Sequence, residues 1–114
     1  MAEYLIGIGY HDPETYSLWE RGLIEDYESS TGLFIEANTA EEAVAWGKHV
    51  GQALLAHVFR HTTPAGPPAE SWIEESVEDR GWKHCVSFFQ RVRVGEMPNL
   101  AEMTTEAYER WLDR

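Results

Sequence analysis

The 114-residue chain has the length of one domain. Hydrophobic residues make up 43% of it and aromatic residues 12%, which excludes a disordered chain and provides enough apolar surface for one core. Twenty acidic residues against nine basic ones give a formal net charge of -11, so we exclude direct binding to nucleic acids and to anionic membranes.

The first predicted element is a strand at residues 4–10 (YLIGIGY). Its large side chains alternate onto one face, whereas Gly7 and Gly9 fall on the other. The glycines leave that second face thin, which predicts that another backbone or an aromatic ring packs there. Asp12 and Pro13 then have the residue types of a helix start, and any helix that begins there is short.

Residues 22–37 allow two interpretations. They form either a helix tail followed by a strand, or a hairpin whose turn is the SSTG sequence at residues 29–32. The clustering of Ser, Thr and Gly between two apolar runs favours the hairpin. Residues 33–35 (LFI) are a strand in both interpretations.

The clearest element is a helix from about residue 39 to about residue 60. Thr39 and Glu42 have the spacing of a capping box, in which each side chain satisfies a backbone amide of the first turn. Apolar and small residues then recur at helical spacing. Ala43, Gly47 and Gly51 make one face of this helix small, which predicts a close approach to a sheet.

The second half of the chain opens with a loop, because residues 62–69 contain three prolines and a glycine. Residues 71–73 are predicted to form a short strand, and residues 82–94 form the main strand of this half. Thr104 then caps a terminal helix. The apolar stripe of that helix consists of Tyr108, Trp111 and Leu112.

Together these elements predict an α+β fold in a single domain over residues 1–114. The architecture is a two-layer sandwich, with an antiparallel or mixed sheet of three to five strands, one long helix and one or two short helices. A ferredoxin-like strand order is the simplest version.

The charge and the single cysteine bear on location and partners. Residues 1–57 hold ten acidic residues and two basic ones, whereas residues 58–114 hold ten acidic and seven basic. The first half therefore predicts an acidic surface, which either keeps the protein in solution or meets a basic partner.

Cys85 has no disulfide partner in the chain, the N-terminus lacks a basic signal-peptide region, and no apolar run is long enough to cross a bilayer. We expect a soluble cytoplasmic protein.

His57 and His61 are the candidate metal ligands. They lie four residues apart on one helix face, a spacing at which two imidazoles can bind one ion. The sequence indicates no third ligand, and histidines at the end of a helix also suit its negative dipole end. We therefore predict no metal and no cofactor, and keep His57 and His61 as the only metal candidates.

No catalytic motif is present. The chain lacks a phosphate-binding loop, a nucleophile elbow and paired cysteines. In a strand, His84 and Cys85 point to opposite sides and cannot act as a nucleophile and its base. We assign no catalytic residue and expect a non-enzymatic protein.

The predicted interaction residues are Glu25, Asp26, Glu28 and Trp46. The first three form an acidic cluster, and Trp46 lies on the flank of the long helix, away from its small face; tryptophan is enriched at interfaces. We expect these residues to bind a basic protein, as an inhibitor or immunity protein does, or a second copy in a homodimer through an open sheet edge. The alternative is a small ligand-binding or metal-binding domain or enzyme, with a site near His57 and His61 and a pocket between sheet and helices.

Overall fold

A computed structural model of the chain describes residues 1–12, 20–22, 28–59, 68–74 and 86–113. The described strands are β1 (Ala2–His11), β2 (Glu28–Ala37), β3 (Glu70–Ile73) and β4 (Arg91–Arg93). The described helices are α2 (Ala40–Val58), the short 3-10 helix η2 (Leu100–Glu102) and α3 (Thr105–Leu112). The strands form one sheet in the order β3-β1-β2-β4. β1 runs antiparallel to β2 and β3, and β2 runs parallel to β4.

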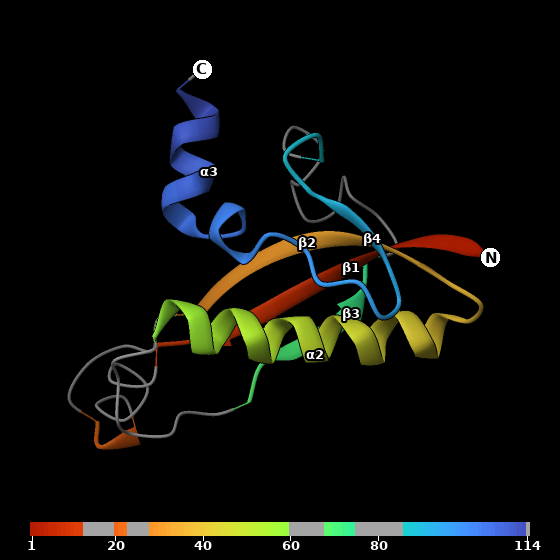
Figure 1. Cartoon of the computed structure of the whole chain (residues 1–114). Coiled ribbons are helices and arrows are strands. Elements are labelled where there is room, and N and C mark those ends of the chain that lie inside the picture. The colour runs from red at the N-terminus through yellow and green to blue at the C-terminus, as the bar shows by residue number, and fades with distance from the viewer. Residues whose placement is uncertain (13–19, 23–27, 60–67, 75–85, 114) are drawn as a thin grey trace.

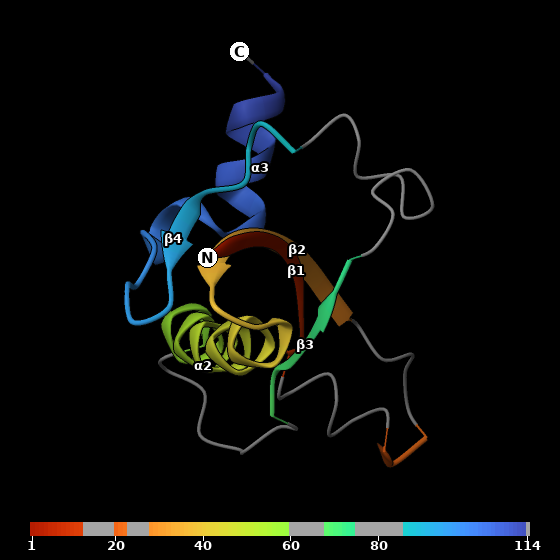
Figure 2. The ribbon, with the colours of Figure 1, turned by 90° about the vertical axis from the view of Figure 1, so that its right-hand side faces the viewer.

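The helices pack on a curved sheet and confirm the α+β class. α2 lies along one face of the sheet, and the strands bend around it (Figure 1). Figure 2 looks along α2 and shows the sheet as an arc around that helix, with α3 standing on the far side of the arc. The strand order departs from a ferredoxin-like arrangement, because β1 and β2 pair directly instead of enclosing a third strand.

The core lies between α2 and the concave face of the sheet. Alternation along β1 and β2 places their branched side chains on this face, where Ile6, Ile8, Leu33 and Ile35 are completely buried. From α2, Val50 and Leu54 complete the core, also with no exposed surface. None of the helices in the described part of the chain is long and apolar enough to cross a membrane.

The small face of α2 is what brings the helix close to β1. A methyl group built on Gly47 would lie 2.5 Å from Ile6 Cγ2, and one on Gly51 would lie 2.9 Å from Ile8 Cγ2. Both distances are shorter than carbon atoms tolerate, so only glycine fits at this helix–strand spacing. The predicted small-residue contact between the helix and a sheet is confirmed.

The convex face of the sheet has two glycines opposite each other. Gly7 and Gly32 are cross-strand partners of β1 and β2. The Trp72 ring from β3 occupies the space in which a Gly7 side chain would lie, and the Phe89 ring occupies that of Gly32. Two aromatic rings thus cover the thin region of the sheet, which confirms the prediction of a ring packed against the glycine face.

The predicted hairpin turn at residues 29–32 is wrong. These residues are extended within β2 and pair with β1 in a continuous register from Glu28 to Ala37. Gly32 has no positive φ; it is required by the Phe89 ring, and the strand contains no bend there. Serine and threonine in a strand carry the same composition signal as a turn, and only the partner strand distinguishes the two.

The predicted strand at residues 82–94 is much shorter than expected. Of the described residues 86–94, only Arg91–Arg93 form a strand, and residues 86–88 form a turn in which the Phe89 N–H donates to the Val86 carbonyl at 3.2 Å. Residues 82–85, which include His84 and Cys85, lie outside the described residues. Phe88 and Phe89, which belong to the apolar pattern of this segment, lie at the turn and not in a strand.

The other predictions have varied outcomes. The short strand at residues 71–73 and the two capped helices are confirmed, with Thr39 accepting from the Glu42 N–H at 3.2 Å and Thr104 from the Ala107 N–H at 3.2 Å. Asp12 follows the end of β1, and the short helix expected from Pro13 onward falls on residues 13–19, which are not described.

Candidate functional site

A pocket lies at the place where β4 stops pairing with β2. β4 pairs only with Phe34–Glu36, so the preceding part of β2 faces the junction between η2 and α3. The cavity there measures about 260 Å³ and opens to solvent. We call it the β2–α3 pocket. Its ten lining residues are Tyr10, Ser29, Ser30, Thr31, Phe88, Phe89, Met103, Thr104, Thr105 and Tyr108.

The inner wall of the β2–α3 pocket is formed by paired residues of β1 and β2. Tyr10 lies opposite Ser29 in the register of the two strands. Only 4% of Tyr10 is exposed, and its ring meets that of Phe59 edge to face at a centroid distance of 6.1 Å. The sheet core therefore holds the Tyr10 ring in place and leaves its hydroxyl to bond with Ser29.

The outer wall is aromatic and comes from α3 and the turn before β4. Phe88 meets Tyr108 in a T-shaped contact at 5.2 Å and lies 5.6 Å from the Trp111 ring. Tyr108 and Trp111 stack on each other at 5.8 Å. The predicted apolar stripe of the terminal helix is thus used to hold Phe88, except that Leu112 is 53% exposed.

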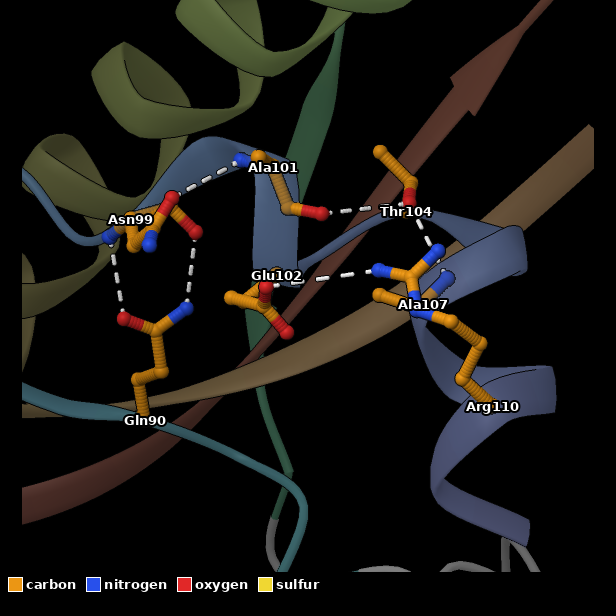
Figure 3. A network of polar contacts seen from close by, with 7 residues as sticks. All are labelled: Gln90, Asn99, Ala101, Glu102, Thr104, Ala107 and Arg110. Atoms are coloured by element: carbon orange, nitrogen blue, oxygen red, sulfur yellow. Dashed lines mark hydrogen bonds and ion pairs between the residues drawn. The ribbon is translucent and has the colours of Figure 1, made fainter. Parts of the chain in front are cut away.

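A polar network fixes the rim of the pocket (Figure 3). The Gln90 side chain makes two 2.9 Å hydrogen bonds to the Asn99 backbone, accepting from its N–H and donating to its carbonyl. Asn99 in turn accepts from the Ala101 N–H at 3.2 Å, and the Thr104 hydroxyl donates to the Ala101 carbonyl at 3.3 Å. The chain from β4 to α3 is therefore held by side-chain bonds, and Thr104 cannot rotate freely.

The electrostatics of the pocket disfavour an anion. None of the ten lining residues in the described part of the chain carries a charge. Burial raises the pKa of the Tyr10 phenol above its usual 10.0, the hydrogen bond with Ser29 lowers it, and the Glu106 carboxylate raises it. The phenol is therefore neutral at physiological pH and can donate a hydrogen bond, and the charge that acts on it is negative.

A second, more polar hollow of about 460 Å³ lies on the other side of Phe88. Its lining includes Glu102 and Arg110, whose side chains form an ion pair at 4.0 Å across the start of α3 (Figure 3). Both partners are more than half exposed, so this pair contributes little stability. Phe88 is the wall that the two hollows share.

The structure places some of the predicted interaction residues and not others. Trp46 is half-buried; its Nε1–H donates to the Glu96 carbonyl at 2.9 Å, and its ring stacks on His49 at 4.8 Å. Glu28 is the first residue of β2, and its side chain is not described. Glu25 and Asp26 lie outside the described residues. A partner surface formed by these four residues stays a prediction.

The histidine pair also stays a prediction. His57 lies half-buried in the last turn of α2, and His61 falls beyond the described residues. Within residues 1–12, 20–22, 28–59, 68–74 and 86–113, no three His, Cys, Asp or Glu side chains come together as metal ligands.

Sequence analysis missed the β2–α3 pocket. Ser29, Ser30 and Thr31 were assigned to a turn, and Phe88 to the middle of a strand. A signal was present in three consecutive hydroxyl residues, but their place beside Thr104 and Thr105 depends on contacts between distant segments. Comparisons with protein-family models, curated proteins and solved structures found no match to this chain.

Proposed function

We propose that this protein is a non-catalytic binding domain whose ligand occupies the β2–α3 pocket. The observation that carries the proposal is the lining itself. The aromatic side chains of Phe88 and Tyr108 line it together with the hydroxyl residues of β2, and the lining comes from four separate segments. Concave apolar sites with a few convergent polar groups are the usual form of ligand sites.

The charge of the pocket supports a neutral or cationic ligand. The described residues of its lining offer hydroxyl donors and acceptors but no cation to pair with an anionic group. Glu106 acts on the Tyr10 hydroxyl, and the whole chain carries a net charge of -11. A carboxylate or phosphate would enter this field against repulsion.

The test uses three small aromatic compounds that differ in charge: p-cresol, benzylamine and benzoate. Each is titrated into the ¹⁵N-labelled protein while the backbone amides are followed by NMR. We expect p-cresol and benzylamine to shift the amides of Thr31, Thr104 and Thr105, with dissociation constants of about 1–10 mM, the range for roughly 0.3–0.5 kcal/mol per heavy atom. We expect benzoate to bind more weakly than both.

A matched pair of variants locates the binding. Phe88→Ala removes the aromatic wall and should weaken p-cresol binding by about five-fold or more. Leu112→Ala, on the exposed side of α3, should leave binding unchanged. Circular dichroism confirms that both variants are folded. Shifts that are scattered over the surface, or binding that Phe88→Ala leaves intact, would contradict the proposal.

A further inference from the structure

The outer edge of β2 beside the pocket has backbone groups with no strand partner among the described residues; Gly32 is buried there, whereas Ser30 is exposed. Where β4 is present, the Phe34 N–H donates to the Gln90 carbonyl at 3.0 Å, and the Glu36 carbonyl accepts from the Val94 N–H at 3.1 Å. Even-numbered residues of β2 therefore point their N–H and carbonyl groups away from β1. The register with β1 continues without a bulge to Glu28, so Ser30 and Gly32 point the same way.

No described strand covers this part of the edge. β4 begins with Arg91 opposite Phe34, and the chain before it turns away at residues 86–88. Ser30, with its exposed side chain, lies both on the open edge and in the lining of the β2–α3 pocket. An open strand edge beside a side-chain pocket is the arrangement used for peptide binding by strand addition.

We infer that the β2–α3 pocket holds one apolar side chain of an extended, neutral or basic polypeptide, whose backbone pairs with β2 at Ser30. This inference rests on the proposed function of the pocket. A volume of about 260 Å³ is below the roughly 300–1,000 Å³ of drug-sized sites, and it suits a single side chain. The open edge then supplies the hydrogen bonds that one side chain lacks.

Charge decides between a partner peptide and a second copy of this chain. Two copies would each bring a net charge of -11 to the same edge, with Glu106 close to it on both sides. Like charges at close range oppose such pairing, whereas a peptide carrying lysines is attracted. We therefore assign the edge to a partner peptide.

The experiment starts with a pool of acetylated and amidated heptapeptides. They carry Phe, Leu or Trp at the centre and Thr, Val, Ser or Lys elsewhere, and a matched pool has Glu in place of Lys. Sequences enriched on the immobilised protein are resynthesised and titrated by fluorescence anisotropy. We expect enrichment from the lysine pool, and slowed hydrogen exchange at the amide of Ser30 when peptide is bound.

Two substitutions at one position separate the backbone from the side chain. Ser30→Pro removes the outward N–H and leaves the hydrogen bonds between β1 and β2 intact, because that N–H does not face β1. It should weaken peptide binding by about five-fold or more. Ser30→Ala keeps the N–H and should bind peptide like the wild type.

The outcomes distinguish this inference from the proposed function. If p-cresol binds but no peptide is enriched, or if Ser30→Pro binds peptide as tightly as Ser30→Ala does, strand addition is overturned and the pocket function stands. If p-cresol also fails to bind, the proposed function fails. If Ser30→Pro does not fold, unchanged exchange at Ser30 in the peptide-bound wild type overturns the inference. A dimer of the free protein that Ser30→Pro converts to a monomer would assign the edge to a second copy.

Discussion

Replacing Gly47 by alanine tests the close contact between α2 and β1. The new methyl group would lie 2.5 Å from Ile6 Cγ2, about 1 Å inside a normal carbon–carbon contact. Ile6 is completely buried and β-branched, so it has little freedom to rotate away. The Ser71 Cβ, at 3.4 Å from the new methyl group, limits movement toward β3.

Two effects of opposite sign set the magnitude. Overpacking a well-packed core destabilises by roughly 1–3 kcal/mol. Alanine in place of glycine within a helix stabilises by roughly 1 kcal/mol. Subtracting the gain from the middle of the overpacking range, we expect Gly47→Ala to lower the free energy of unfolding by about 1 kcal/mol and the Tm by about 4 °C for a chain of this size.

Urea denaturation at 25 °C, followed by far-ultraviolet circular dichroism, measures the change. Lys48 lies next to Gly47 on the exposed face of α2, and its alanine and glycine variants calibrate helix propensity at this place. There the alanine variant should be the more stable by about 1 kcal/mol. Gly51→Ala, with closest contacts of 2.9 and 3.0 Å, should destabilise less than Gly47→Ala.

The sign of the stability change caused by Gly47→Ala shows whether the contact with Ile6 or the helix propensity is the larger effect. If Gly47→Ala is as stable as the wild type or more stable, helix propensity outweighs the contact, and α2 does not need glycine to approach β1. The same conclusion follows if Gly51→Ala is the more damaging of the two substitutions.

The remaining predictions concern caps, a buried phenol and the rim network. Thr39→Ala removes the cap of α2 and should lower the free energy of unfolding by about 1 kcal/mol in urea; no change would mean that another group caps the helix. The raised pKa of Tyr10 means that the unfolded chain ionises first, so its contribution to stability is complete below pH 10 and is lost as the pH rises above that value. Urea curves at pH 9 to 11 should show a smaller loss in Tyr10→Phe than in the wild type, and an equal loss would refute this. Gln90→Ala removes both hydrogen bonds to the Asn99 backbone and should destabilise by about 1–2 kcal/mol in thermal melts, whereas Gln90→Glu, which keeps one acceptor, should lose less.

Much of the fold could be predicted because its signals are local. The α2 helix combines a cap, helical periodicity and a run of small residues, and each of these depends on neighbours within a few positions. β1 has a clear alternation, and its glycines correctly indicated a ring on the convex face. In both elements the local preference agrees with the tertiary contacts.

The errors lie where local signals are ambiguous. Residues 29–32 have the composition of a turn, yet ten residues of pairing with β1 keep them extended. Phe88 belongs to an apolar alternation typical of a strand, yet its contacts with Tyr108 and Trp111 hold it in a turn. In both cases the deciding interaction joins residues about 20 apart in the chain, which no short window contains.

The amino-acid sequence alone determined the acidic α+β class, the long capped helix and the glycine faces, because charge, composition and periodicity act residue by residue. The tertiary structure decided the β2–α3 pocket and the open edge of β2. Both arise because β4 pairs with only three residues of β2, and because the Gln90 bonds to Asn99 place the start of α3 beside the remainder of that strand. The acidic composition acts locally at that pocket, because the Glu106 carboxylate raises the pKa of Tyr10 in its inner wall.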